Sequence, residues 1–167
     1  DSNGWFHTGD IGEFDSDGYL KITDRKKNIL VTSGGKNIAP APMENVMVTS
    51  RYIEQVVVIG DNRNYISALI VPAFEAIESY FLENDKEIVS HAELVENSDV
   101  ISLISREINI AMKSFANYER VKKFTLIPRL LTLEKGELTP TLKVVRRVVL
   151  DNFQDKVDNM YKDDSKG

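Results

Sequence analysis

The sequence predicts an α+β fold in which a small three-stranded sheet is flanked by helices and preceded by a β-hairpin. Residues 55–60 and 65–71 are rich in β-branched side chains and are joined by a short polar turn, which predicts a central buried hairpin. Residues 121–127 form a third strand-like run. Between residues 99 and 115, apolar side chains recur at steps of three and four, the pattern of an amphipathic helix packed against a core.

The first predicted element is a separate β-hairpin. Residues 11–14 and 19–23 resemble short strands, and the turn-forming segment 15–18 joins them. The chain starts without an initiator Met and enters a dense motif at once, so we expect it to be part of a longer polypeptide. The charged break at residues 24–28 is the candidate boundary between this hairpin, which is expected to belong to another domain, and the α+β domain that follows.

A second hairpin turn and a first helix are predicted next. Residues 29–31 lead into a turn at 32–37 that contains two adjacent glycines. Proline lacks only a hydrogen-bond donor that the first turn of a helix does not use, so Pro42 fits the start of a helix. The apolar face of this helix would carry Met43, Val46 and Met47.

Helices dominate the second half of the chain. We expect one at residues 73–84, one that begins at an Asp99 N-cap, and a closing helix from Lys143 to about residue 161. Residues 162–167 are polar and charged and are predicted to be a solvated tail.

Composition excludes several classes of function. With 167 residues, 42% of them hydrophobic, the chain can bury one core. The net charge of -5 offers no overall field for nucleic acid, so a bound anion must be held locally. The absence of cysteine excludes disulfides and cysteine nucleophiles and favours a cytoplasmic location. No apolar run approaches the ~20 residues of a transmembrane segment, and neither His7 nor His91 has the spacing of a metal site.

The segment Thr8-Gly9-Asp10 is the first candidate binding site. Glycine lets a backbone approach a ligand closely, and a carboxylate accepts two hydrogen bonds from a vicinal diol such as a ribose. The alternative is a simple turn in which the Asp is a cap. Both interpretations fit so short a motif.

Two further segments have a structural and a functional interpretation. The cluster at residues 24–28 is either a solvated turn or a group of cations that meets a phosphate. The adjacent Gly34 and Gly35 form either a turn that needs positive φ or a passage for a narrow, flexible substrate arm.

Lys143 is the candidate catalytic cation. It follows Thr139, Pro140 and Thr141 and would open the closing helix, where the helix dipole prefers anions. This mild mismatch indicates either an ordinary surface lysine or a cation positioned for the negative charge of a ligand.

Five ordered motifs resemble the AMP-forming acyl-CoA synthetases of the adenylate-forming superfamily, and in particular the C-terminal region of a long-chain fatty acid CoA ligase. The resemblance covers nearly the whole chain. The motifs are GWFHTGDIG at 4–12, DGYL at 17–20, DRKK at 24–27, GGKNIAP at 34–40 and TPTLK at 139–143.

The resemblance implies a role for each candidate residue. Asp10 would bind the ribose hydroxyls of ATP and of the acyl adenylate, and Arg25 would contact the nucleotide. Lys143 would be the catalytic cation of adenylation. The hinge between domains would lie at Asp24 to Lys27, and the tunnel for the pantetheine arm of CoA would be formed by Gly34, Gly35 and Lys36.

The resemblance also implies the domains and partners. Residues 1–24 would end the large N-terminal adenylation domain, and residues 25–161 would form a C-terminal lid domain that rotates between two half-reactions. The intact enzyme would use a fatty acid, ATP and CoA, with Mg2+ held by the triphosphate and the missing N-terminal domain, and would meet the membrane only peripherally through its substrate. The phosphate loop of such enzymes is absent, so the chain alone is expected to be inactive.

Two other functions stay open at this point. An adenylate-forming enzyme could load a carrier protein in place of CoA or use another carboxylic acid, because both acceptors present the same thiol arm. Alternatively, the chain could be a non-catalytic binding module in which the same motifs serve a stable interface.

Overall fold

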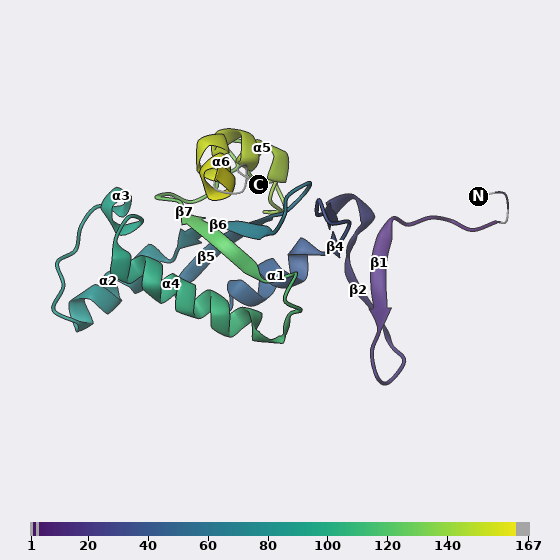
Figure 1. The fold of residues 1–167 in the computed structure, drawn as a ribbon, viewed down its shortest axis with the longest axis horizontal. Helices are drawn as coiled ribbons and strands as arrows, with labels where there is room; N and C mark the ends of the chain where they lie inside the picture. Colours follow the sequence, from purple (N-terminus) through teal and green to yellow (C-terminus); the bar gives the residue numbers. More distant parts are fainter. Residues whose placement is uncertain (1, 3, 163–167) are drawn as a thin grey trace.

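The computed structural model describes residue 2 and residues 4–162 and consists of a projecting hairpin and an α+β domain (Figure 1). The side chains of Asp24 and Lys27, both predicted at the hinge, lie outside the description, as does most of the predicted tail, residues 163–167. None of the described helices combines the length and hydrophobicity that crossing a bilayer requires.

The predicted N-terminal hairpin is present. Strands β1 (Asp10–Phe14) and β2 (Leu20–Arg25) pair antiparallel, and the turn between them is closed by the Asp15 carboxylate, which accepts from the backbone N–H groups of Asp17 and Tyr19. The hairpin projects from one end of the molecule (Figure 1). Several of its large apolar side chains are exposed, a feature of surfaces that meet other protein.

A short 3-10 helix, η1 (Lys26–Asn28), leads from the hairpin into a second, two-residue ladder between β3 (Leu30–Val31) and β4 (Asn37–Ile38). Helix α1 (Pro40–Met47) follows, with Pro42 in its first turn as predicted. Met43 and Met47 are fully buried against the sheet domain, which confirms the predicted apolar face.

The central sheet has the predicted three strands in the order β5 (Ile53–Ile59), β6 (Ile66–Pro72) and β7 (Val121–Leu126). β5 and β6 pair antiparallel, and β6 and β7 pair parallel through a crossover that contains helices. All seven residues of β6 are buried, as expected for a central strand that is covered on both faces.

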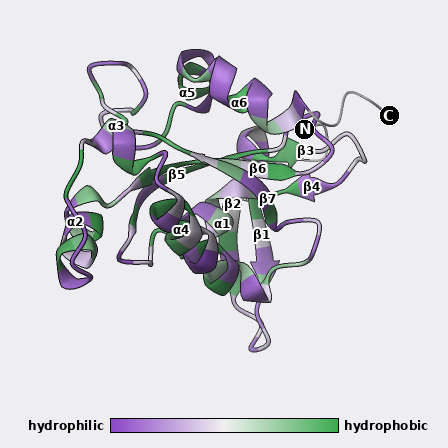
Figure 2. Cartoon of the chain, turned by 60° about the vertical axis from the view of Figure 1, so that its left-hand side comes forward, coloured by the Kyte–Doolittle hydropathy of each residue, from purple (hydrophilic) through white to green (hydrophobic). Residues whose placement is uncertain are grey.

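Helices cover both faces of this sheet and divide the core into two clusters. One face packs against α1, α2 (Phe74–Glu83) and α4 (Ser98–Ala111), and the other against α5 (Arg146–Asn152) and α6 (Gln154–Tyr161). Alternation along β5 shows the division, since Val56 and Val58 join the first cluster while Val57 and Ile59 join the second. In Figure 2 the amphipathic α4 shows both hydrophobic and hydrophilic colours.

One prediction at α4 needs correction, and one helix before it was not predicted. Asp99 is not the N-cap: the Asn97 side chain accepts from the backbone N–H groups of Asp99 and Val100, which places Asp99 inside the first turn. The structure also contains a short helix that was not predicted, α3 (His91–Leu94). A reciprocal capping box between Ser90 and Glu93 starts it.

The predicted closing helix from Lys143 to residue 161 is wrong in two respects. The chain leaves helical geometry at Phe153, with φ -122, so two helices, α5 and α6, replace one. Lys143 precedes α5 and lies outside any helix. The interpretation of its charge as a mismatch with a helix dipole therefore does not hold.

Candidate functional site

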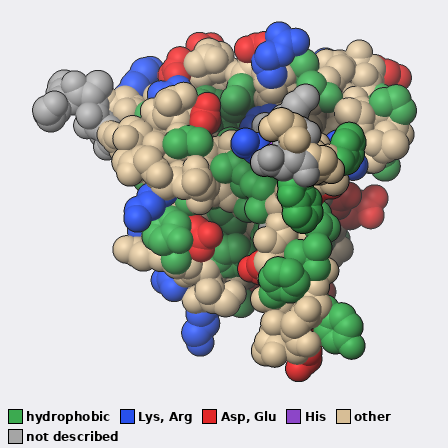
Figure 3. Space-filling model, turned by 90° about the vertical axis from the view of Figure 1, so that its right-hand side faces the viewer, with side chains coloured by type: hydrophobic (Ala, Val, Ile, Leu, Met, Phe, Trp, Pro, Cys, Tyr) green, Lys and Arg blue, Asp and Glu red, His purple; other side chains and the backbone are tan. Residues whose placement is uncertain are grey.

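Three residues that lie far apart in the sequence line one cavity of about 810 Å3. Asp10 comes from the start of β1, Arg25 from the end of β2, and Lys143 from the loop before α5. The cavity lies between the hairpin, α1 and that loop; we call it the inter-element groove. Figure 3 views the molecule from the hairpin side, where hydrophobic side chains are exposed beside scattered charges.

The hairpin register brings Asp10 and Arg25 together. They are paired across β1 and β2, and Arg25 Nε lies 3.3 Å from Asp10 Oδ1. Just before them, Gly9 has φ +76 and its carbonyl accepts from the Lys26 N–H at 2.8 Å. Asp10 is thus a strand residue at a backbone bend and not a helix cap, and its carboxylate lines the groove beside a guanidinium.

Lys143 is carried by a tight loop. The Thr139 N–H donates to the Lys143 carbonyl at 2.8 Å, and the Lys143 N–H donates to Thr139 Oγ1 at 3.1 Å. Leu138 and Val144 form an isolated antiparallel bridge below them, and Leu142 adopts φ 59 at the turn. The lysine is exposed at the groove, where a ligand anion can reach it.

Sequence reasoning missed a second ion pair in the groove. Arg146 Nη2 lies 2.7 Å from Glu44 Oε1, and the same carboxylate oxygen accepts from the Val58 N–H at 2.8 Å. The pair connects α5 to α1 and β5, so it holds the wall of the groove. Neither residue has a sequence pattern of its own, because their pairing depends on a contact between distant helices.

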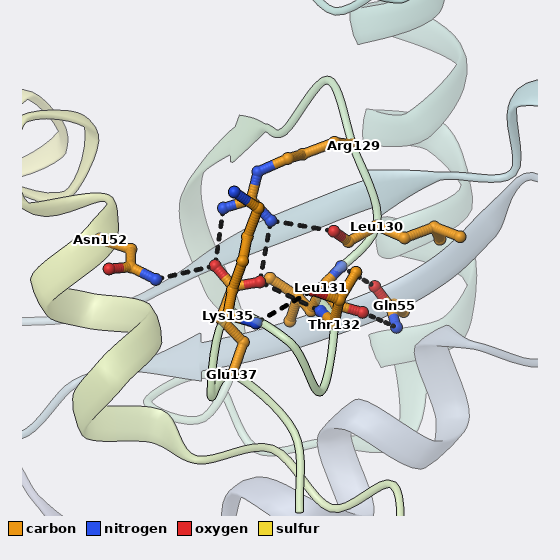
Figure 4. A network of polar contacts seen from close by, with 8 residues as sticks. All are labelled: Gln55, Arg129, Leu130, Leu131, Thr132, Lys135, Glu137 and Asn152. Atoms are coloured by element: carbon orange, nitrogen blue, oxygen red, sulfur yellow. Dashed lines mark hydrogen bonds and ion pairs between the residues drawn. The ribbon is translucent and has the colours of Figure 1, made fainter.

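A second missed feature is a buried polar network around Glu137, the residue that comes just before the Lys143 loop in the chain (Figure 4). The Glu137 side chain is 0% exposed, and its two carboxylate oxygens accept from Arg129 at 2.8 and 2.7 Å. Asn152 of α5 and the Thr132 N–H donate to the same carboxylate at 2.9 and 3.1 Å. No periodicity marks this glutamate, whose burial depends on partners from two other segments.

These donors dominate the ionisation of Glu137. Burial alone would raise the pKa of its carboxyl group, but the hydrogen bonds from Arg129, Asn152 and Thr132, with the charge of Arg129, lower the pKa to about 2. The carboxylate is therefore ionised throughout the physiological pH range.

We expect the Glu137 network to make stability depend on acid pH. The pKa of Glu137 is lower in the folded than in the unfolded chain, so its contribution is complete above about pH 5 and is lost as the pH falls toward 2. Glu137→Gln should lower the free energy of unfolding by roughly 2 kcal/mol at pH 7. Urea denaturation of the unchanged protein and of Glu137→Gln between pH 7 and pH 3 should show the difference in their free energies of unfolding becoming smaller as the pH falls. A difference that stays constant over this range would contradict the lowered pKa of Glu137.

The glycine loop lies apart from the inter-element groove. Among the described residues that line the cavity, none comes from residues 32–36. The loop is closed by Thr32, whose N–H donates to the Lys36 carbonyl and whose hydroxyl accepts from the Lys36 N–H. Of the two adjacent glycines, Gly35 has positive φ, +74, and Gly34 does not, so the turn requires glycine at position 35.

Space is open around the tip of this loop. A Cβ built on Gly35 would meet no described heavy atom within 4 Å. Ser33 anchors the loop to the β5–β6 connection through the Arg63 carbonyl and the Asn64 side chain, while the Lys36 ammonium lies 5.4 Å from the centre of the Tyr118 ring. The loop is therefore fixed at its base and accessible at its glycine.

The predicted hinge residues lie where the chain passes from β2 into η1. Asp24 is a residue of β2 and Lys27 a residue of η1, and the backbone of Arg25 between them is extended.

Within residues 2 and 4–162, no group of three or more acidic or histidine side chains could hold a metal ion. The imidazole of His91 instead stacks on the Phe74 ring, with 3.7 Å between the ring centroids, and His91 Nε2 lies 3.5 Å from Glu78 Oε1.

Comparison with solved structures defines the class of protein. The chain is similar to the adenylation domain of a carboxylate reductase from Mycobacterium chelonae, with a TM-score of 0.77 and 25% identity over 97% of this chain and 24% of that one. The fold is thus that of the C-terminal part of an adenylate-forming enzyme.

Residues 27–165 match the family model described as AMP-binding enzyme C-terminal domain, and the chain belongs to that family. Long-chain-fatty-acid–CoA ligase FadD15 of Mycobacterium tuberculosis is 41% identical over 161 residues, which are 96% of this chain and 27% of the relative. Human long-chain-fatty-acid–CoA ligase 1 is 37% identical over 164 residues, 96% of this chain and 23% of the relative. The chain spans about a quarter of the length of these relatives.

Proposed function

We propose that the chain is the C-terminal portion of an ATP-dependent long-chain fatty acid CoA ligase, which activates a fatty acid as acyl-AMP and then forms acyl-CoA. Residues 1–24 end the N-terminal adenylation domain, residues 25–161 form the lid domain, and residues 162–167 are a tail. The family membership and the names of the relatives support the enzyme class. The single observation that carries the mechanism is the convergence of Asp10, Arg25 and Lys143 on one groove.

The groove suits an adenylate. The Asp10 carboxylate accepts hydrogen bonds from ribose hydroxyls, and Arg25, 3.3 Å from it, contacts the nucleotide. Lys143 places an ammonium at the carboxylate and α-phosphate, where negative charge develops on the transferring oxygens during adenylation. Carboxylate and cations thus face one ligand that has a diol at one end and phosphate at the other.

The second half-reaction uses the other site on the lid. Rotation about the segment from Asp24 to Lys27 withdraws Lys143 and presents Gly34, Gly35 and Lys36 to the active site. Their loop lies outside the groove and is open at Gly35, which fits a surface that meets the pantetheine arm only after rotation. This chain alone is inactive, because the substrates bind largely to the N-terminal domain.

The reaction needs ATP and CoA as substrates and Mg2+ as cofactor. In this proposal Mg2+ is held by the triphosphate and by the N-terminal domain, because Mg2+ is usually bound by one or two carboxylates together with substrate phosphates. The enzyme is cytoplasmic, and it associates peripherally with the inner face of the membrane through its fatty acid substrate.

Similarity to the adenylation domain of a carboxylate reductase, which is not named as a CoA ligase, favours a second candidate. In it, the enzyme forms the same adenylate but transfers the acyl group to a carrier protein or acts on another carboxylic acid.

A thioester assay of the intact enzyme separates the two candidates. Palmitate and ATP are supplied with either CoA or a phosphopantetheinylated carrier protein. Acyl transfer is measured by mass spectrometry of the acylated acceptor. Transfer to CoA at least tenfold faster is expected. Faster transfer to the carrier protein would replace the ligase proposal, and failure of both acceptors with palmitate but success with a short or aromatic acid would change the substrate class.

A further inference from the structure

The loop that carries Lys143 is rigid within itself but needs a fixed base. Its internal hydrogen bonds join Thr139 to Lys143, and the bridge between Leu138 and Val144 closes it. These contacts hold the shape of the loop. They do not determine where its tip lies relative to the sheet domain, because every one of them is made inside the loop.

Glu137 forms that base. Its carbonyl accepts from the Val145 N–H at 2.8 Å, so it pairs the two ends of the loop, and its own N–H donates to the Thr132 carbonyl at 3.1 Å. Its carboxylate joins the loop to the segment after β7 through Arg129 and to α5 through Asn152 (Figure 4). One residue thus connects the Lys143 loop to the two elements that flank it.

The network reaches the wall of the groove. Gln55 of β5 donates to the Leu131 carbonyl and accepts from the Leu131 N–H, which fixes the segment between Arg129 and Thr132 against the sheet. Gln55 and Leu138 both line the inter-element groove. The buried carboxylate of Glu137 is therefore connected, through Arg129 and the segment that follows it, to Gln55, which lines the same groove as Lys143.

A buried ion pair is weak evidence for stability, since apolar side chains of similar volume often stabilise a fold as well. What the bidentate pair with Arg129 adds is geometry, because two parallel hydrogen bonds fix both distance and orientation. From this arrangement we propose that Glu137 is a positioning residue for adenylation, which acts through Arg129 and Asn152 to hold the Lys143 ammonium at the groove. The proposal rests on the proposed function of Lys143.

The test is Glu137→Gln in the intact enzyme, with palmitate and ATP as substrates. Glutamine keeps the size of the side chain but replaces one acceptor by a donor that faces other donors. We expect kcat for adenylation to fall about 10- to 100-fold, as for a displacement of the cation on the order of 1 Å. KM for ATP and the rate of thioester formation from supplied palmitoyl adenylate should stay within about twofold.

The decisive measurement repeats Glu137→Gln in a Lys143→Ala background. A residue that acts through Lys143 has no further effect once the ammonium is gone, so the second loss should be under about twofold. The matched control is Arg147→Ala, an exposed arginine on the same helix as Asn152 that pairs only weakly with Asp151, and it should leave both half-reactions unchanged. Arg129→Lys, which keeps the charge but loses the bidentate geometry, should reproduce the loss in adenylation.

The outcomes separate the proposal from its premise. Equal losses in both half-reactions, or the same loss in the Lys143→Ala background, would show a merely structural role and overturn the proposal. If Lys143→Ala is slow in adenylation but Glu137→Gln is not, only the role of Glu137 fails; if Lys143→Ala is unaffected, the proposed function fails first. Should Glu137→Gln not fold, Arg129→Lys carries the same comparison.

Discussion

Replacing Lys143 by alanine in the intact enzyme is expected to slow acyl adenylate formation by roughly a hundred- to a thousandfold. Negative charge develops on the transferring oxygens as the carboxylate attacks the α-phosphate, and a cation already in place stabilises it without reorganisation. Water must do so in the variant, at the cost of orienting its dipoles during the reaction.

This expectation depends on where Lys143 lies in the folded structure. The lysine lines the groove with Asp10 and Arg25, and we propose that one bound adenylate contacts all three. Two hydrogen bonds join the backbone of Lys143 to the backbone and hydroxyl of Thr139, so the loop holds the start of the lysine side chain in one place.

Two assays divide the reaction. Exchange of labelled pyrophosphate into ATP in the presence of palmitate measures adenylation, and release of palmitoyl-CoA from supplied palmitoyl adenylate measures thioester formation. Lys143→Ala should fail only in the first. Lys135→Ala, which removes an exposed lysine from the preceding turn, should behave as wild type in both. Equal loss of both steps in Lys143→Ala would remove its assigned role.

Much of the fold could be predicted from local patterns. The β-branched runs of β5, β6 and β7 identify the sheet because their side chains suit a pleated, buried surface, and the turn residues at 15–18 identify the first hairpin. The helical period of α4 is also local, since it follows from burial of one face.

The predicted helix boundaries are wrong where a contact between distant segments or a single backbone dihedral angle determines where a helix begins or ends. Apolar spacing continues from α5 into α6, but Phe153 leaves helical geometry and packs with the second cluster of the core, so one predicted helix becomes two. Asn97 competes with Asp99 for the cap of α4, and both are good capping residues that a pattern alone cannot rank.

The candidate site divides in the same way. Asp10, Arg25 and Lys143 belong to motifs that resemble a known family, and all three line one groove in the structure. Glu137 and the pair of Glu44 with Arg146 have no such motif, because a buried charge is recognised by its partners and these come from other elements. Motifs therefore locate the groups that are proposed to contact a ligand, whereas the groups that support them are found only from the fold.

The largest effect on the second half-reaction is expected at Gly35. We predict that Gly35→Leu lowers the rate of thioester formation from supplied palmitoyl adenylate by about a hundredfold, while adenylation changes by less than about threefold. The glycine has φ +74 and open space around the position of a Cβ, so a leucine side chain would extend into the path that the rotated loop offers to the pantetheine arm.

Backbone strain must be separated from obstruction, because an L-residue at positive φ costs about 1 to 2 kcal/mol wherever it occurs. Gly18→Leu is the matched control: Gly18 has φ +84, and a Cβ there would also meet no described heavy atom within 4 Å, but it lies at the turn of the N-terminal hairpin. Both variants should show a similar decrease in melting temperature, but only Gly35→Leu should lose thioester formation. A Gly35 variant that is slow in adenylation alone would instead place this loop at the first half-reaction, with Lys143, and would contradict a rotation that exchanges the two surfaces.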